Sequence, residues 1–241
     1  MNHIIEVKNL VKEFGKTRAV DGLSFSVEEG TITGLLGPNG AGKTTTIQML
    51  LDLITPTSGE ILILGKHLAE NREAVLSRIN FSSPYVSLPG NLKVVENLTT
   101  FARLYGVRDI KKKIDELVDF FEIRPLLPKI TSTLSTGQLT RLNLTKALLN
   151  DPKLLLLDEP TASLDPDIAD KTRLMLQRVK NERGVTILYT SHNMQEVEEI
   201  CDEVIFIQNG RLKDQGTPAA LVAKYGHKDL NDVFLHIART Q

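Results

Sequence analysis

The chain has 241 residues and a formal net charge of −1, and 41% of its residues are hydrophobic and 24% charged. This length and composition fit one large α/β domain, or a domain with an insertion, that buries a sizeable core. A surface with almost no net charge has no basic field to attract nucleic acid or anionic lipid, so we expect no nucleic-acid partner.

The sequence favours a cytoplasmic protein. The segment 1–14 mixes charged and apolar residues and lacks the apolar stretch of a signal peptide. The longest apolar runs, such as Leu154–Leu157, are too short to cross a bilayer, so any membrane role must come through a partner. The single cysteine, Cys201, cannot form an internal disulfide and is expected to be a buried thiol in a reducing compartment.

The pattern of the first 64 residues predicts strands before and after a glycine-rich loop. Alternating residues and short apolar runs predict four strands, at Ile4–Leu10, Leu23–Val27, Thr31–Leu36 and Glu60–Leu64. The glycine-rich loop 37–42 follows the third of them, and helical spacing then continues from Lys43 to Ile54. The order is therefore strand, phosphate-type loop and helix.

Helices dominate from about Pro84 to Asn150. Amphipathic spacing predicts three of them, at Asn91–Tyr105, Ile110–Phe121 and Thr136–Asn150. Pro125 and Pro128 break the chain between the second and the third. We interpret this part as a helical insertion.

Strands and helices alternate after the insertion, which indicates a parallel sheet. We expect strands at Leu154–Leu157 and Val185–Tyr189, and helices at Asp167–Glu182 and Met194–Ile200. Asn209-Gly210 predicts a tight hairpin between Val204–Gln208 and Arg211–Asp214, and a helical segment begins at Thr217.

The glycine-rich loop carries a phosphate-binding motif. Gly37-Pro38-Asn39-Gly40-Ala41-Gly42-Lys43-Thr44, followed by Thr45, matches G-x-x-x-x-G-K-[ST]. Glycines let backbone N–H groups point at phosphates, and the helix N-terminus adds a favourable dipole. Lys43 is expected to reach the β- and γ-phosphates and Thr44 to ligate Mg²⁺, so the predicted ligands are ATP and Mg²⁺. An accidental glycine turn would not explain the strand before the loop and the helix after it.

A second motif ends the strand at Leu154–Leu157. Asp158 and Glu159 follow it directly, at the strand's carboxyl end, where ligands bind in open α/β sheets. Asp158 suits the Mg²⁺ shell, and Glu159 is placed to polarise the attacking water. The alternative is that both acids, standing before Pro160, only cap a helix.

A third motif makes the family resemblance specific. Leu134-Ser135-Thr136-Gly137-Gln138 resembles the signature motif of the ABC ATPases, usually written LSGGQ, with Thr136 in place of the first glycine. A helix N-terminus at Ser135 and Gly137 is also an anion-binding arrangement. Taken alone, an ordinary N-cap by Ser135 would explain the same residues.

Three further elements resemble the family pattern in the same order. Phe14 stands where an aromatic residue stacks on adenine, Ser163-Leu164-Asp165 resembles the D-loop, and His192 resembles the switch histidine. Each also has a plain alternative. Phe14 could be a core residue, Asp165 a helix N-cap and His192 a surface-loop residue.

The resemblance covers nearly the whole chain and implies its fold. The implied fold is an α/β P-loop NTPase (RecA-like) core with an N-terminal antiparallel β subdomain and an inserted α-helical subdomain. The core would comprise residues 1–83 and 151–216, the helical signature subdomain residues 84–150, and a C-terminal helical extension residues 217–241.

The resemblance also implies partners and roles for residues. Two ATPase subunits would sandwich two ATP molecules, with Ser135, Gly137 and Gln138 of one subunit facing the γ-phosphate held by Lys43 of the other. His192 would contact the γ-phosphate, and Asp165 would link the two sites. The second subunit would be another copy of this chain or a relative, and both would bind transmembrane permease subunits at the cytoplasmic face of the membrane.

Within the family, the chain's ending resembles that of the ATPase subunits of exporters for drugs, lipids and polysaccharides. Gly216-Thr217-Pro218 and Asp232-Val233-Phe234-Leu235 carry this resemblance. The segment entering the helical insertion departs from the family, because Phe81-Ser82-Ser83-Pro84-Tyr85 has no glutamine. Ser83 or Pro84 stands at the position where that glutamine would reach Mg²⁺ and water.

Two other functions compete with a transport ATPase. A soluble ABC protein acting on DNA or ribosomes would usually carry a long coiled coil or two ATPase domains, and neither is evident in the sequence. A nucleotide-regulated scaffold without turnover would not need both Glu159 and His192.

Overall fold

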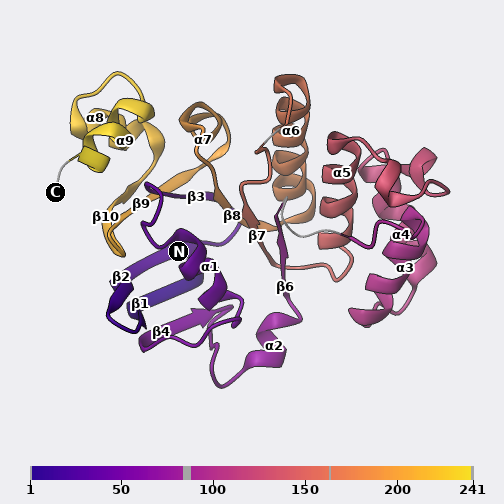
Figure 1. Cartoon of the computed structure of the whole chain (residues 1–241), viewed down its shortest axis with the longest axis horizontal. Coiled ribbons are helices and arrows are strands. Elements are labelled where there is room, and N and C mark those ends of the chain that lie inside the picture. The colour runs from indigo at the N-terminus through magenta and orange to yellow at the C-terminus, as the bar shows by residue number, and fades with distance from the viewer. Residues whose placement is uncertain (1, 84–87, 163, 240–241) are drawn as a thin grey trace.

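Two β-sheets of different kinds organise the chain (Figure 1). The computed structural model describes residues 2–83, 88–162 and 164–239. One sheet has four strands and lies in the N-terminal part, and the other has six strands and runs through the centre. This architecture confirms the expected α/β fold with an antiparallel β part and inserted helices.

The four-stranded sheet is antiparallel, in the order β2-β1-β4-β5. Its strands are β1 (His3–Phe14), β2 (Thr17–Glu28), β4 (Ser58–Ile63) and β5 (Lys66–His67). Alternate side chains of β2, such as Leu23, Phe25 and Val27, are buried, as the period-two pattern predicts. β1 and β2 are longer than expected because they continue as a hairpin beyond their apolar segments.

The six-stranded sheet has the order β10-β9-β3-β8-β7-β6. Its strands are β3 (Ile32–Leu36), β6 (Ile79–Ser82), β7 (Leu154–Asp158), β8 (Thr186–Thr190), β9 (Glu203–Gln208) and β10 (Arg211–Gly216). All its pairings are parallel except the β9–β10 hairpin, which turns at Asn209-Gly210 as predicted. The leucines of β7 are fully buried, as expected for a parallel strand covered on both faces. No strand was expected at β6.

Helices flank the central sheet and gather at two ends of the molecule (Figure 1). They are α1 (Lys43–Leu50), α2 (Arg72–Leu76), α3 (Val94–Leu104), α4 (Ile110–Phe120), α5 (Thr136–Ala147), α6 (Pro166–Arg183), α7 (Met194–Ile200), α8 (Pro218–Tyr225) and α9 (Leu230–Arg239). Two short 3₁₀ turns lie at Arg124–Leu126 and Thr131–Thr133. Helices α3–α5 lie at one end, beyond β6, while α8 and α9 lie at the other, near β9 and β10.

Most helix limits match the sequence expectation, and the differences have local causes. α1 ends at Leu50 instead of Ile54, because Asp52 takes a left-handed conformation with φ 54°. α3 begins at Val94 instead of Asn91, where the Glu96 carboxylate accepts a 2.7 Å hydrogen bond from the Lys93 N–H. Among the described residues, no helix combines the length and apolar character needed to cross a bilayer.

Candidate active site

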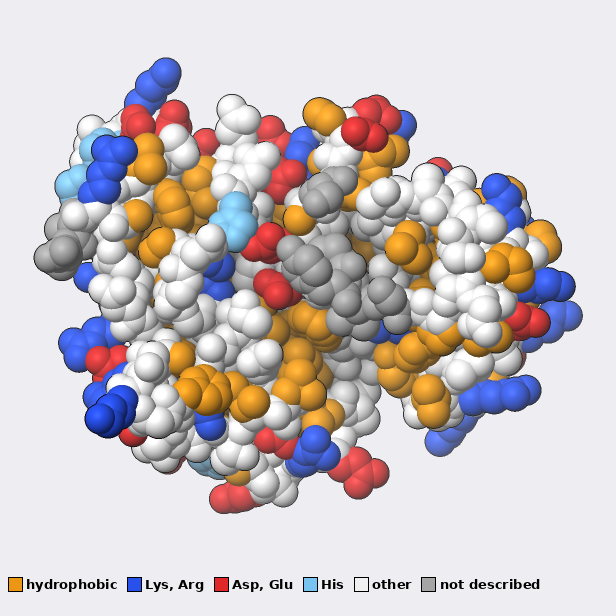
Figure 2. Space-filling view, viewed as in Figure 1, with side chains coloured by type: hydrophobic (Ala, Val, Ile, Leu, Met, Phe, Trp, Pro, Cys, Tyr) orange, Lys and Arg blue, Asp and Glu red, His pale blue; other side chains and the backbone are white. Residues whose placement is uncertain are grey.

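Three of the sequence motifs meet around one cavity of about 540 Å³. The cavity is lined by Ala19, Asn39, Gly40, Ala41, Gly42, Lys43, Thr44, Thr45, Asp158, Glu159 and His192. β3, β7 and β8 are parallel, and β8 lies between the other two, so their carboxyl ends lie at one edge of the sheet. Figure 2 shows acidic and histidine side chains together near the middle of this face of the molecule.

The glycine-rich loop can be formed only by glycine at two of its positions. A Cβ on Gly37 would lie 2.1 Å from the carbonyl oxygen of Ile207. Gly42 has φ 102°, and a Cβ there would lie 2.6 Å from the carbonyl oxygen of Ala19. Gly42 is also the N-cap of α1, so the N-terminal end of this helix, whose first N–H groups have no partner within the helix, borders the cavity.

Lys43 places a buried cation in the loop. Its Nζ donates hydrogen bonds to the carbonyl oxygens of Gly37 at 2.6 Å and Pro38 at 3.2 Å. Burial lowers the pKa of Lys43, while the nearby carboxylates of Glu159 and Asp158 act in the opposite direction. The loop therefore presents a partly desolvated positive charge between main-chain groups and two acids.

Thr190, at the end of β8, organises the two acids at the end of β7. Its buried hydroxyl donates a 2.7 Å hydrogen bond to Oδ1 of Asp158 and accepts a 3.0 Å bond from the N–H of Glu159. Glu159 has φ 51°, a conformation that is uncommon for residues other than glycine. The hydroxyl of Thr190 thus fixes both the carboxylate of Asp158 and the unusual backbone of Glu159.

His192 contacts Glu159 directly. Its Nε2 lies 2.5 Å from Oε1 of Glu159, and its side chain is about half exposed. His192 is therefore a half-exposed loop residue, as its plain alternative expected, and it also contacts an acid that lines the cavity. Asp158, Glu159 and His192 were predicted from the sequence, but Thr190 was not. Its signal is a hydroxyl at the carboxyl end of a buried strand.

The signature residues lie outside this cavity. Ser135 caps α5: its hydroxyl accepts from the Gln138 N–H at 3.4 Å, and the Gln138 side chain accepts from the Ser135 N–H at 3.2 Å. Gly137 is buried, and a Cβ there would lie 2.7 Å from Cγ2 of Ile168 in α6. Within one chain, Ser135 is therefore a helix cap, and Gly137 allows α5 to pack closely on α6.

The remaining predicted residues take varied positions. Phe14, at the end of β1, is 51% exposed with Lys12 Nζ 5.0 Å from its ring centroid, which excludes the core alternative. Asp165 is the N-cap residue of α6, but its side chain forms no capping hydrogen bond. Ser83 is buried just after β6. Pro84, Tyr85 and Ser163 lie outside the described residues.

Comparison with known proteins identifies the family of this chain. Residues 20–162 match the ABC transporter family. The chain is 40% identical over 218 residues to the bacitracin transport ATP-binding protein BcrA of Bacillus licheniformis, covering 89% of this chain and 70% of the relative. It is 37% identical over 235 residues to the Nod factor export ATP-binding protein I of Ralstonia nicotianae, covering 96% of this chain and 72% of that relative.

Solved structures show the same fold. An ATP-binding subunit of an ABC transporter superposes with a TM-score of 0.86 at 28% identity, covering 98% of this chain and 100% of that structure. The cbiO1 protein of Clostridium perfringens, part of the ABC transporter complex cbiONQ, superposes with a TM-score of 0.85 at 28% identity. The superposition covers 99% of this chain and 97% of that structure. This chain therefore belongs to the ABC transporter family, as an ATP-binding subunit that hydrolyses ATP to drive transport.

Proposed function

We propose that this chain powers export through separate transmembrane permease subunits, at the cytoplasmic face of the membrane. The observation that carries the proposal is the meeting of Lys43, Asp158, Glu159 and His192 around one cavity. Two of the similar relatives are transport or export ATP-binding proteins, for bacitracin and Nod factor, which supports the outward direction.

The glycine-rich loop would hold the phosphates of ATP. Its glycines keep the backbone open, the α1 N-terminus favours negative charge, and Lys43 supplies a cation beside the carbonyls of the loop. Thr45 also lines this cavity. The exposed ring of Phe14 is free of the core and would stack on the adenine base.

The residues at the cavity fit Mg²⁺. Thr44 offers a hydroxyl and Asp158 a carboxylate, which are hard oxygen donors of the kind that Mg²⁺ prefers. The bond from Thr190 to Oδ1 orients Asp158, whose other carboxylate oxygen would bind the metal. Bound Mg²⁺ would supply neutralising charge on the phosphates.

Glu159 and His192 would carry the hydrolytic step. A carboxylate can accept a proton from an attacking water. The uncommon backbone conformation of Glu159 would direct its carboxylate from the end of β7 toward that water. His192 would hold the orientation of the Glu159 carboxylate and contact the γ-phosphate.

A second ATPase subunit would complete the site. The N-terminal end of α5, with Ser135 as its N-cap and Gly137 and Gln138 in its first turn, lies outside the cavity of its own chain. This end would face ATP held by another subunit. Asp165, with no capping bond, would link the two sites. The core of residues 1–83 and 151–216 would hold ATP, residues 84–150 would present the signature, and residues 217–241 would form an extension.

Co-purification tests this function. The tagged chain is purified from detergent-solubilised membranes of its native cell, and the bound membrane proteins are identified. The complex is then placed in vesicles with its ATPase side outward, with a fluorescent drug as the transport probe and a Lys43→Ala complex as control. ATP-dependent accumulation inside the vesicles, absent with Lys43→Ala, is the expected result. Recovery of the chain without any membrane protein would contradict the proposal.

A further inference from the structure

We propose that Glu196 is a positioning residue for ATP hydrolysis, which orients Glu159 and His192 through a set of buried hydroxyls. This inference rests on the roles proposed above for those two residues. Glu196 lies on α7 with its side chain buried, and it does not line the cavity that holds Lys43. It borders a neighbouring cavity of about 1050 Å³ that Glu159 and His192 also line. We therefore expect Glu196 to act on these hydrolytic residues and not on phosphates held by the glycine-rich loop.

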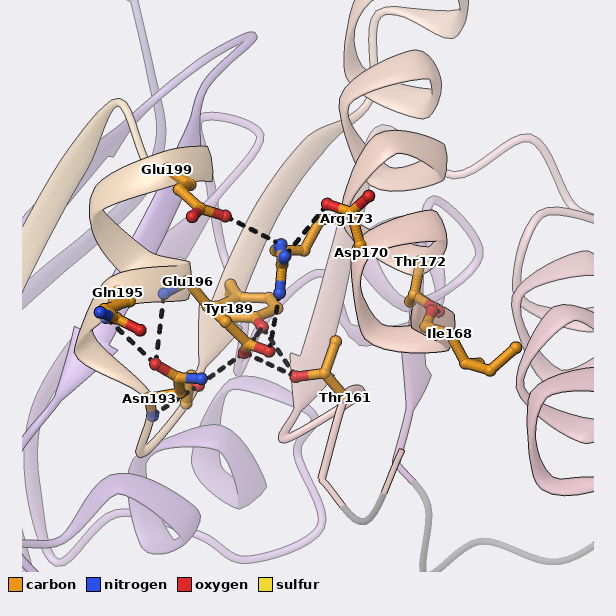
Figure 3. A network of polar contacts seen from close by, with 11 residues as sticks. Thr161, Ile168, Asp170, Thr172, Arg173, Tyr189, Asn193, Gln195, Glu196 and Glu199 are labelled. Carbon is orange, nitrogen blue, oxygen red and sulfur yellow. Dashed lines mark hydrogen bonds and ion pairs between the residues drawn. The ribbon is translucent and has the colours of Figure 1, made fainter. Parts of the chain in front are cut away.

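Three hydroxyl groups converge on one oxygen of Glu196 (Figure 3). Its Oε2 accepts hydrogen bonds from Thr161 Oγ1 at 2.7 Å, Tyr189 OH at 3.0 Å and Ser191 Oγ at 3.2 Å. A carboxylate can only accept, so all three hydroxyls donate to it. Burial raises the pKa of Tyr189, so its phenol keeps the proton that it donates.

These hydroxyls belong to the segments that carry the two hydrolytic residues. Thr161 lies two residues after Glu159, and Ser191 immediately precedes His192. Ser191 Oγ also accepts from the N–H of Asn193 at 3.0 Å, so the backbone is held on both sides of His192. One carboxylate thus joins the segments after β7 and β8, which are about 30 residues apart in sequence.

The charge of Glu196 is balanced by an arginine from another helix. Arg173 on α6 places NH1 3.2 Å from Glu196 Oε1, and exposed Asp170 and Glu199 hold the same guanidinium at 3.1 Å each. A buried carboxylate is costly unless it is paired and hydrogen-bonded, and here it has both kinds of partner. A polar network that is fully satisfied specifies one geometry, which suits a positioning role.

Changing Glu196 should therefore affect turnover more than ATP binding. Gln at this position keeps the shape but removes the charge and turns one acceptor oxygen into an NH₂ donor. In one orientation the three hydroxyls lose their acceptor, and in the other the NH₂ group faces the Arg173 guanidinium, so neither orientation satisfies the network. The segments with Thr161 and Ser191 would then shift, and small displacements of reacting groups lower rates strongly. The glycine-rich loop makes none of these contacts, so ATP affinity should persist.

The test compares Glu196→Gln with Glu199→Gln in the full-length purified chain. Glu199 lies on the same helix and binds the same arginine, but it is exposed and reaches none of the hydroxyls of the described network. Mg²⁺-dependent phosphate release gives kcat and KM, nucleotide titration gives ATP affinity, and thermal unfolding reports the fold. Tyr189→Phe, which keeps the ring and removes one donor, provides a second variant if Glu196→Gln does not fold.

The expected result is a fall in kcat for Glu196→Gln of between about tenfold and a hundredfold, with ATP affinity within about twofold of the unaltered chain. Tyr189→Phe should lower kcat in the same way but less, and Glu199→Gln should leave both values within about twofold. Parallel loss of ATP affinity and kcat in Glu196→Gln would show a merely structural role and overturn the proposal. So would an unchanged kcat in a folded variant.

A Glu159→Gln arm separates this inference from the proposed function. If Glu159→Gln abolishes turnover while Glu196→Gln does not lower it, the proposed hydrolytic site stands and the positioning role is wrong. If Glu159→Gln turns over normally, the proposed function of the site is itself wrong.

Discussion

The Nε2 atom of His192 lies 2.5 Å from Oε1 of Glu159. His192 follows β8, whereas Glu159 follows β7. Thr190, two positions before His192, accepts a hydrogen bond from the backbone N–H of Glu159 through its hydroxyl. The orientation of this carboxylate therefore depends on the segment after β8 as much as on its own strand.

Replacing His192 by Ala should slow hydrolysis without preventing ATP binding. The change removes the imidazole that contacts the Glu159 carboxylate. A polar contact with a charged group is worth about 1.5–3 kcal/mol, so kcat should fall by roughly ten- to a hundredfold. Phosphate release and nucleotide titration on the same preparation measure the two properties. A His192→Ala chain with normal turnover would show that the contact with Glu159 has no role in hydrolysis.

Thr190→Val should damage the site although it changes little in volume. The variant removes the donor to Asp158 and the acceptor for the Glu159 N–H, both inside the protein. We expect kcat to fall by about tenfold or more, because leaving buried polar groups unpaired costs about 1–3 kcal/mol. Thr190→Ser keeps the hydroxyl and is the matched control, which should stay close to the unaltered rate. Equal kcat values for Thr190→Val and Thr190→Ser would show that the Thr190 hydroxyl does not position Asp158 and Glu159 for hydrolysis.

Ser83→Ala should be much milder than Thr44→Ala. Ser83 is buried beside β6, whereas Thr44 lines the cavity directly. We expect the Ser83 hydroxyl to reach the metal site only indirectly, and a single hydrogen bond contributes a net of roughly 0.5–1.5 kcal/mol. Ser83→Ala should therefore slow Mg²⁺-dependent hydrolysis by about tenfold at most. Thr44→Ala removes a proposed metal ligand and should do far more damage. If both variants are equally inactive while binding ATP, Ser83 is itself a primary ligand.

Cys201 should report the integrity of the fold. Burial, followed by the nearby carboxylates of Asp202 and Glu196, raises the pKa of its thiol, so the folded chain keeps the proton above the usual thiol pKa of about 8.5. The contribution of this pKa shift to the stability of the folded chain is fully present below a pH of about 8.5. It is lost as the pH rises through the pKa of Cys201 in the folded state. A thiol reagent at pH 8 should label the native chain at a small fraction of the rate in denaturant. Fast labelling of the native chain would contradict this burial.

The sequence was sufficient for the parts of the site that follow local rules. The glycine-rich loop, the acids at the end of β7 and the histidine after β8 are short motifs at the ends of strands, where parallel topology brings them together. The limits of α7 were predicted correctly because Asn193 is a typical N-cap. The buried state of Cys201 was also predicted correctly.

Contacts between distant residues were not predictable in the same way. β6 is a strand because it pairs with β7, about 75 residues later, and not because of a strong pattern of its own. The hydroxyls of Thr161 and Ser191 look like ordinary loop residues until the fold places both on Glu196. The dual role of Gly137, at a helix N-terminus and against Ile168, likewise requires the packing of α5 on α6.

The central claim is that Glu159 acts in hydrolysis at a site that binds ATP independently of it. The most direct test measures Mg²⁺-dependent phosphate release and ATP binding for Glu159→Gln beside the unaltered chain. We predict ATP affinity close to that of the unaltered chain and a turnover lower by about a hundredfold or more, as expected for loss of a general base. A folded Glu159→Gln chain that binds ATP and hydrolyses it at the unaltered rate would contradict the account.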